Sequence, residues 1–296
     1  MSTIEGFIRR RIATNGITLS VQEAGDGPAL VLLHGYPQNG MCWAKVAPAF
    51  ARQFRVIIPD LRGYGHSDAP PDDAAHTVYS KRTMAQDVVG VLDALGIGAA
   101  HVLGHDRGAR VAYRFALDHP GRLMRLGIIE ILPTADYWAH WDANLGMAAY
   151  HWTFLAQPAP LPERMINADP VFYIDWTLRG WTRAKGLHDF PPESLASYHA
   201  QARDPARIAA MCADYRAGAT TDREIDEADR AAGRRIAAPL RFLWATTGFP
   251  SRTGRPAALW RAWAEDVIDS SCDCGHFAME EAPDAVLAAY LPHFGG

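Results

Sequence analysis

The chain has 296 residues, of which 49% are hydrophobic and 21% are charged. This composition is typical of a folded globular protein and excludes a disordered one. The 29 Lys and Arg against 33 Asp and Glu give a net charge of −4, which argues against binding nucleic acid through phosphate contacts. No apolar run is long enough to span a bilayer, and the N-terminus lacks the layout of a signal peptide. We therefore expect a soluble, cytoplasmic protein without a membrane partner.

The cysteines are few for this length, and they are Cys42, Cys212, Cys272 and Cys274. Disulfide frameworks are typical of small secreted domains, so we expect free thiols. Cys272 and Cys274 stand close in sequence, but a structural zinc site needs a second pair of ligands. We therefore expect no metal.

In chain order, short apolar runs alternate with patterns that have helical spacing. The predicted strands are 29–33, 55–59, 101–104, 126–132 and 240–244, and the predicted helices include 84–95 and 109–117. Strands that are apolar throughout are buried on both faces. Their alternation with helices predicts an α/β fold with a mostly parallel, doubly wound sheet.

The segment 134–230 breaks this alternation. It is dense in aromatic residues and its pattern indicates short helices. We interpret it as a helical cap inserted into one α/β core, which is formed by residues 1–133 and 231–296. A separate helical domain is the alternative.

The segment 104–108, Gly-His-Asp-Arg-Gly, follows a predicted strand and opens a predicted helix. This is the context of a nucleophile elbow, with Asp106 at the position of the nucleophile. The helix N-terminus favours an ionised carboxylate there. The backbone N–H groups of Tyr36, after the first predicted strand, and of Arg107 are expected to form an oxyanion hole. A surface turn capped by an aspartate is the alternative.

A histidine and a second acid complete the predicted triad. His276 lies late in the chain, in the expected order of nucleophile, acid and histidine. The loop 245–249 contains no carboxylate, whereas Glu130 lies inside the apolar run 127–132, near the end of the predicted strand after the elbow helix. A carboxylate in such a run needs a partner, and we expect that partner to be His276. The alternatives for Glu130 are a buried arginine or solvent.

An aspartate nucleophile limits the reaction. Its attack on a saturated carbon forms an ester, which water activated by His276 then hydrolyses. This chemistry suits alkyl halides and epoxides. Arg107 and Arg110 are three residues apart, so they share a helix face beside Asp106 and can bind a substrate carboxylate. The alternative is that they pair with structural carboxylates.

The chain resembles the fluoroacetate (haloacetate) dehalogenases of the α/β-hydrolase superfamily over nearly its whole length. The segments that carry the resemblance are His-Gly-Tyr-Pro-Gln-Asn at 34–39, Gly-His-Asp-Arg-Gly-Ala-Arg at 104–110, Tyr-His-Trp at 150–152, Asp-Tyr-Arg-Ala-Gly at 214–218 and Gly-His-Phe at 275–277. The resemblance implies an α/β-hydrolase fold with an inserted cap. It also implies a homodimer that needs no cofactor.

The resemblance further assigns roles to individual residues. Asp106 would displace the halide, and Arg107 and Arg110 would hold the carboxylate of a small haloacid. Hydrogen bonds to the departing halide would come from His151, Trp152 and Tyr215. Fluoroacetate and water would then give glycolate and fluoride. The chain departs from the family in two places, because Glu130 replaces the usual aspartate and Tyr36 the usual phenylalanine.

Three other readings share part of this pattern. Epoxide hydrolases use the same aspartate, but they normally have two cap tyrosines; Tyr215 fits the second and Phe154 falls at the first. Haloalkane dehalogenases usually have a tryptophan at the position of Arg107. A catalytically silent ligand receptor would have a damaged triad, and none is visible.

Overall fold

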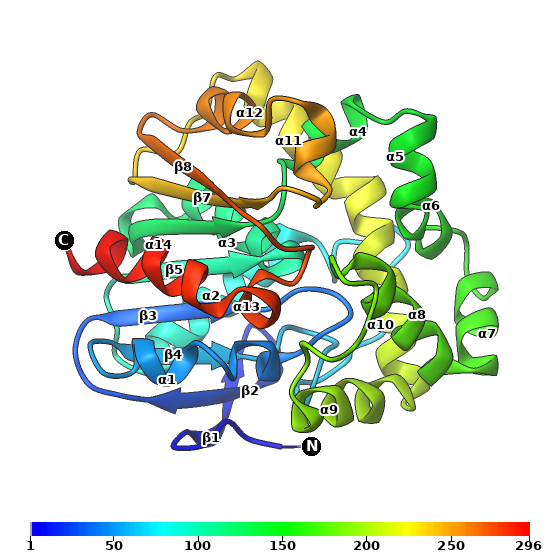
Figure 1. Cartoon of the computed structure of the whole chain (residues 1–296), viewed down its shortest axis with the longest axis horizontal. Helices are drawn as coiled ribbons and strands as arrows, with labels where there is room; N and C mark the ends of the chain where they lie inside the picture. The colour runs from blue at the N-terminus through cyan, green and yellow to red at the C-terminus, as the bar shows by residue number, and fades with distance from the viewer. Residues whose placement is uncertain (1) are drawn as a thin grey trace.

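The computed structural model describes residues 2–296 and contains an eight-stranded sheet (Figure 1). Met1, the first residue of the expected core segment, lies outside the described residues. The strand order is β1-β2-β4-β3-β5-β6-β7-β8. The pairs β1–β2 and β2–β4 are antiparallel and the other pairs are parallel. The predicted fold class, a mostly parallel α/β sheet, is confirmed.

The five adjacent strands β4, β3, β5, β6 and β7 agree with the sequence prediction. The eight strands are β1 (Ile8–Thr14), β2 (Ile17–Ala24), β3 (Ala29–Leu33), β4 (Arg55–Pro59), β5 (Ala100–His105), β6 (Leu123–Ile129), β7 (Leu240–Ala245) and β8 (Val267–Cys272). Strand β6 starts and ends three residues earlier than predicted, so Glu130 lies just beyond it. Strands β1, β2 and β8 were not predicted. Strands β1 and β8 are the edges of the sheet, where exposed polar side chains obscure the apolar pattern.

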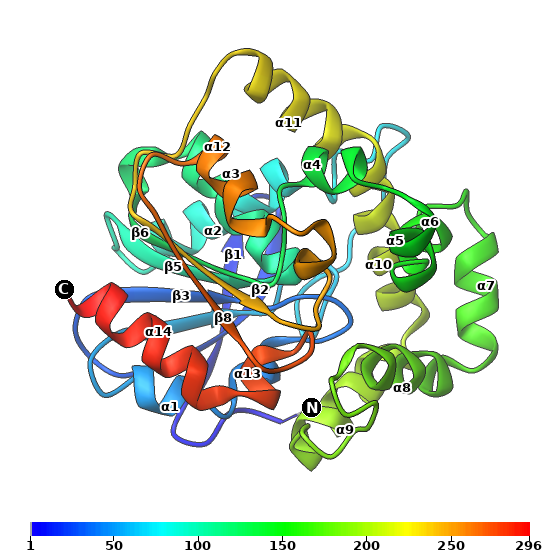
Figure 2. The same ribbon diagram turned by 45° about the horizontal axis from the view of Figure 1, so that its top comes forward.

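Helices cover both faces of the sheet (Figures 1 and 2). In Figure 1, α1 (Ala47–Phe50) and α14 (Pro283–Gly295) lie in front of the sheet, and α2 (Lys81–Ala94) and α3 (Asp106–Asp118) lie behind it. Helix α2 begins three residues before the predicted 84 because the Ser80 side chain caps it by accepting from Thr83 N at 3.2 Å. Helix α12 (Pro256–Trp263) and the short α13 (Ala278–Glu281) complete this part of the chain.

Eight helices connect β6 to β7. They are α4 (Thr134–Ala139), α5 (Ala143–Ala148), α6 (His151–Leu155), α7 (Leu161–Ala168), α8 (Pro170–Trp181), α9 (Pro192–Ala202), α10 (Pro205–Ala219) and α11 (Thr221–Ala231). Figure 1 shows α5 to α10 beyond the carboxyl ends of the parallel strands. In open α/β sheets this is the end at which ligands bind. No helix within residues 2–296 has both the length and the apolar character needed to cross a membrane.

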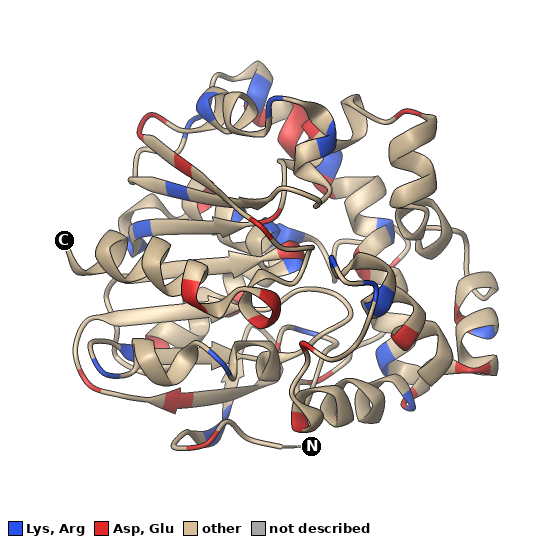
Figure 3. Ribbon diagram, in the orientation of Figure 1, with Lys and Arg blue, Asp and Glu red and all other residues tan. Residues whose placement is uncertain are grey.

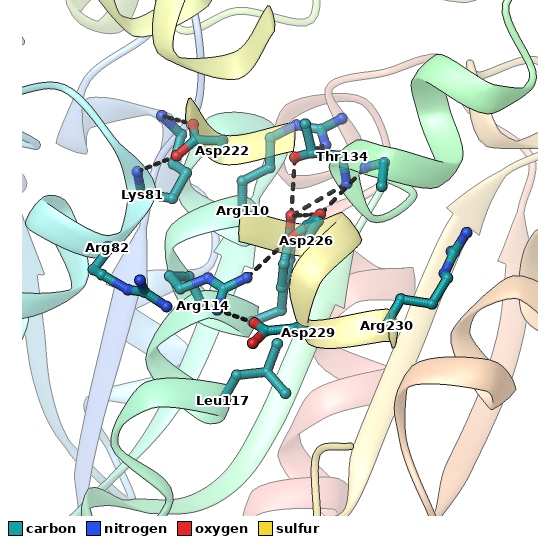
Figure 4. Close-up of polar contacts among 12 residues, drawn as sticks. Lys81, Arg82, Arg110, Arg114, Leu117, Thr134, Asp222, Asp226, Asp229 and Arg230 are labelled. Atoms are coloured by element: carbon teal, nitrogen blue, oxygen red, sulfur yellow. Dashed lines mark hydrogen bonds and ion pairs between the residues drawn. The ribbon is translucent and has the colours of Figure 1, made fainter. Parts of the chain in front are cut away.

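Helix α11 is joined to α2 and α3 by buried charges (Figure 4). Asp226 accepts hydrogen bonds from Arg114 Nη2 and from the Tyr113 hydroxyl, both at 2.7 Å. Arg114 also pairs with Asp229, and Lys81 lies 3.6 Å from Asp222. Away from this cluster, acidic and basic residues are interspersed over the helices and strands (Figure 3). The buried pairs fix α11 against the helix that carries Asp106.

Candidate active site

Asp106 lies at the sharp junction between β5 and α3. Its φ of +47° is left-handed, a conformation that costs a non-glycine residue energy and that is found at functional sites. The turn has no room for side chains at the flanking glycines, because a Cβ on Gly108 would lie 2.3 Å from His34 O. Asp106 is 5% exposed, and its Oδ1 accepts from Tyr36 N at 2.8 Å. The junction therefore has the geometry predicted for a nucleophile elbow.

The three residues of the predicted triad meet at this elbow. His276 Nε2 lies 3.7 Å from Asp106 Oδ2, and His276 Nδ1 lies 3.9 Å from Glu130 Oε1. The loop that carries His276 is held by its backbone N–H, which donates to Trp181 O at 2.9 Å. These distances are longer than hydrogen bonds, as is common in free enzymes whose catalytic contacts tighten on binding substrate. The imidazole stands between the two carboxylates.

Glu130 reaches the loop after β7 even though it directly follows β6 in the chain. Its φ is +62°, its Oε2 accepts from Ala245 N at 2.6 Å, and it is 1% exposed. Gly248 leaves the space for the carboxylate, since a Cβ there would lie 1.5 Å from Glu130 Oε1. Neither alternative for Glu130 is observed: it is not exposed, and within residues 2–296 no arginine pairs with it.

The electrostatics favour an ionised Asp106. Burial alone would raise the pKa of its carboxyl, but His276 and the nearby cations lower that pKa below its usual range. Burial alone would lower the pKa of the His276 imidazole, but the carboxylates of Asp106 and Glu130 raise it to about 9. Burial raises the pKa of the Glu130 carboxyl. At neutral pH the free protein therefore holds an imidazolium beside the Asp106 carboxylate.

The two predicted substrate arginines are held in different ways. Arg107 already has a carboxylate partner, because its Nε and Nη2 lie 3.1 and 2.5 Å from Asp214 Oδ1. Arg110 Nη1 donates instead to Leu132 O at 3.0 Å and to Thr134 Oγ1 at 2.9 Å. Within residues 2–296, Arg110 forms no ion pair. Of the two arginines, Arg107 pairs with a carboxylate of the protein, which was the alternative to substrate binding, and Arg110 does not pair with one within residues 2–296.

Aromatic side chains surround these guanidinium groups. The guanidinium carbons of Arg107 and Arg110 lie 5.1 and 4.5 Å from the ring centre of Trp152, in the range of cation–π contacts. The Tyr215 ring packs edge-on against both Trp152, at 5.5 Å, and His151, at 5.4 Å. The structure thus brings together the three residues assigned to halide binding.

Several buried polar atoms at this place have no hydrogen-bond partner within residues 2–296. They are Arg107 Nη1, Arg110 Nε, His151 Nδ1 and the hydroxyl groups of Tyr36, Tyr137 and Tyr215. Buried groups of this kind are costly unless something pairs with them. Burial lowers the pKa of the His151 imidazole well below its usual value, so this ring is neutral. The site therefore offers cationic and neutral donors close to the Asp106 carboxylate.

A small inner cavity of about 10 Å³ lies beside Asp106, and its lining does not include Arg107 or Tyr215. It is lined by Asp106, Arg110, Glu130, Ile131, Tyr137, His151, Trp152, Phe249, Pro250 and His276. This volume has room for about one water molecule. Side chains must therefore move before an organic substrate can enter.

Comparison with known proteins identifies the family. A family profile described as "alpha/beta hydrolase fold" matches residues 28–283. The chain belongs to the α/β-hydrolase family. It is similar to a fluoroacetate dehalogenase from Burkholderia sp., with 40% identity over 95% of this chain and 91% of the relative. It is also similar to a soluble epoxide hydrolase from Corynebacterium sp. (strain C12), with 33% identity over 95% and 94%.

Solved structures of other α/β hydrolases agree with this assignment. A protein from Nostoc sp. PCC 7120, provisionally assigned as an α/β hydrolase, superposes with a TM-score of 0.95, 42% identity and 99% coverage of both chains. A protein from Pseudomonas aeruginosa, provisionally assigned as an epoxide hydrolase, gives 0.93, 41% identity and coverages of 100% and 97%. The family resemblance predicted from the sequence is confirmed.

Sequence reasoning missed residues that support this hydrolase site. Asp214, the partner of Arg107, also binds Lys81 and accepts from Tyr64 at 2.9 Å. Gly248 was part of a loop noted only for lacking a carboxylate, and Tyr137 was counted only among the cap aromatics. An acid beside Tyr215 on an otherwise apolar helix face is the signal that points to Asp214. The contact of Gly248 with Glu130 has no signal in the sequence.

A chain of hydrogen bonds connects Arg110 to α11. The Tyr113 hydroxyl contacts Thr134 Oγ1 at 2.9 Å and donates to Asp226. We expect Tyr113→Phe to lower the free energy of unfolding by about 1–3 kcal/mol, because Asp226 then loses a buried donor. Tyr137→Phe is the matched control, since its buried hydroxyl has no partner within residues 2–296, and we expect no loss of stability because its removal also removes a desolvation cost. Urea denaturation measures both, and equal losses would contradict this role.

Proposed function

We propose that this hydrolase removes the halogen from a short 2-haloacid, and that fluoroacetate and water give glycolate, fluoride and a proton. The observation that carries the proposal is the buried Asp106 carboxylate at a strained strand–helix turn, with two arginines and the side chains of His151, Trp152 and Tyr215 around it. The 40% identity to the Burkholderia fluoroacetate dehalogenase supports it.

In the first step, Asp106 Oδ2 attacks the carbon that bears the halogen. Tyr36 N–H holds Oδ1 at 2.8 Å, so Oδ2 is the oxygen that is free to attack. A new C–O bond forms as the carbon–halogen bond breaks, and the halide leaves with the electron pair. Arg110 and Arg107 Nη1 bind the substrate carboxylate, and His151, Trp152 and Tyr215 donate to the halide in place of its hydration water.

In the second step, water hydrolyses the ester on Asp106. His276 takes a proton from the water, and the resulting hydroxide attacks Asp106 Cγ. The charge then develops on Oδ1, where the backbone N–H groups of Tyr36 and Arg107 form the oxyanion hole. The ester C–O bond breaks, His276 returns the proton to the glycolate oxygen, and Asp106 releases the remaining proton to solvent. Glu130 stabilises the imidazolium formed in this step.

The charge on Asp106 couples the two steps. In the free enzyme the Asp106 carboxylate helps to raise the pKa of His276 to about 9. Esterification removes that negative charge, so the pKa of His276 falls and the imidazole becomes the neutral base that the second step needs. Asp106 needs no such change, because its pKa lies below the usual range.

This coupling predicts how the rate depends on pH. Lowering the pH from about 8 to about 5 protonates His276 in the ester and slows hydrolysis, while Asp106 stays ionised and still attacks. We expect kcat to fall while the first-turnover release of halide keeps its amplitude. Rapid-quench measurement of fluoride checks this. If the amplitude of first-turnover fluoride release falls together with kcat, the loss of rate at low pH arises in the first step instead.

The direct test of the function is incubation of purified protein with fluoroacetate and with chloroacetate under a halide-selective electrode. Turnover in ¹⁸O-labelled water should place one labelled oxygen in Asp106 and, over repeated cycles, in glycolate. Absence of halide release from both acids would overturn the proposal. Halide release without label in Asp106 would overturn the ester route.

An epoxide hydrolase is the second candidate. The 33% identity to the Corynebacterium enzyme favours it, as does the Tyr215 hydroxyl, which has no hydrogen-bond partner within residues 2–296. Opening an epoxide with water releases no proton, whereas each dehalogenation releases one, so a pH-stat distinguishes the two reactions. A neutral epoxide has no carboxylate for Arg107 and Arg110 to bind beside Asp106.

Three further expectations remain predictions. Residues 134–230 are proposed to act as a cap on a core of residues 1–133 and 231–296, which limited proteolysis tests. The homodimer is tested by light scattering after gel filtration, and the cytoplasmic location by cell fractionation. A catalytically silent receptor would bind haloacids and release no halide.

A further inference from the structure

A second cavity lies directly outside the inner one, and the two share Phe249 and His276. The outer cavity measures about 90 Å³, against about 10 Å³ for the inner one. Its wall is formed by the end of α8 with the turn that follows it, by the last residue of α5, and by the loop after β7. The outer cavity is large enough to hold a small anion, whereas the inner cavity is not.

The charged side chains of the outer cavity are positive. Lys185 and Arg252 line it, and its lining within residues 2–296 includes no Asp or Glu. Both side chains are exposed, and the salt bridges of residues 2–296 include neither of them. On a protein with a net charge of −4, a hollow with two unpaired cations and no carboxylate attracts anions.

The backbone holds Lys185 in place at this wall. Its φ is +55°, a left-handed conformation that is strained for a residue other than glycine. The turn is closed by Thr182 Oγ1, which accepts from Gly186 N at 3.1 Å. The ammonium folds back to donate to Gly180 O at 2.6 Å, and Gly180 itself lines the cavity. The turn therefore keeps a charge at the cavity wall.

The inner site gives a reason for such a cavity. The ionised Asp106 repels any anion that approaches, and Asp214 already offsets the charge of Arg107. We propose that the outer cavity, with Lys185 and Arg252, is a binding site for small monovalent anions. This proposal rests on the proposed function: the outer cavity binds the haloacid before it enters the inner site, and it binds the halide after the halide leaves that site. Phe249, which belongs to both walls, is the side chain that must move between the two positions.

The test is the double variant Lys185→Gln/Arg252→Gln. We expect KM for fluoroacetate to rise about fivefold to twentyfold at low ionic strength, with kcat changed less than about twofold. The difference should shrink at about 0.5 M salt, where exposed charges are screened. Bromide binding, followed through tryptophan fluorescence because Trp181 lines the cavity, should weaken by a similar factor.

The matched control is Arg179→Gln/Arg255→Gln, which removes the same charge from two exposed residues that line neither cavity. If the wild-type protein releases fluoride and both double variants behave alike, the proposed anion site is wrong. If the wild-type protein releases no halide, the proposed function is wrong. In that case the bromide titration still decides whether Lys185 and Arg252 bind an anion, so the two failures are distinguishable.

Discussion

Replacement of His276 with alanine will stop the reaction at the ester on Asp106. The first step needs only the carboxylate and the donors around the substrate, so one equivalent of fluoride per site should be released. The second step lacks its base, and kcat should fall about 100-fold or more. Intact-mass spectrometry after incubation with fluoroacetate should show the mass of one carboxymethyl group added to the protein. Digestion should place it on the peptide that contains Asp106.

The control for this experiment is the double variant Asp106→Asn/His276→Ala, which lacks both the nucleophile and the base. It should carry no adduct and release no fluoride. An adduct on another residue, or a loss of activity without any adduct in the His276→Ala protein, would move the nucleophile away from Asp106. A circular dichroism spectrum like that of the wild type would show that the variant is folded.

The central strands β3 to β7 were predictable because each contains a short, mostly apolar run. Strands β3 and β4 were predicted residue for residue. The edges were not, because β1 carries Arg9 to Arg11 on a strand that pairs on one side only. A run of three arginines has no apolar alternation, so the sequence does not indicate a strand there. The hairpin is recognised only from the pairing of β1 with β2 in the structure.

The triad was predictable for a different reason. The proposed nucleophile and histidine have expected places in the order of the chain, and the strand–turn–helix context points to Asp106. The support of the site was not predictable, because it depends on contacts between distant elements. Asp214 meets Arg107 only when α10 lies over α3, and the sequence alone does not assign a partner to either residue. Placement of His151, Trp152 and Tyr215 together came from the family resemblance.

Replacement of Gly248 with alanine should remove most of the activity through Glu130. The added Cβ would lie 1.5 Å from Glu130 Oε1 and 2.4 Å from its Cδ, so the carboxylate must leave its position beside His276. Loss of an oriented acid in such a triad lowers kcat by up to about 10⁴-fold. We expect at least about a 100-fold decrease in kcat, with ester accumulating on Asp106 because hydrolysis is the step that needs the acid.

The same clash predicts a specific rescue. Glu130→Asp shortens the side chain by one methylene and withdraws the carboxylate from the space that the new Cβ occupies. Alone, it should lower activity, because the carboxylate no longer reaches Ala245 N. In the Glu130→Asp background, Gly248→Ala should cost much less than it does in the wild type, so the two effects are non-additive. Gly121→Ala, where a Cβ meets no atom within 4 Å, controls for the glycine replacement itself. A clash between the new Cβ and Glu130 must be relieved when the acidic side chain is shortened. If Gly248→Ala lowers kcat equally in both backgrounds, the position of the acid beside His276 does not depend on this glycine.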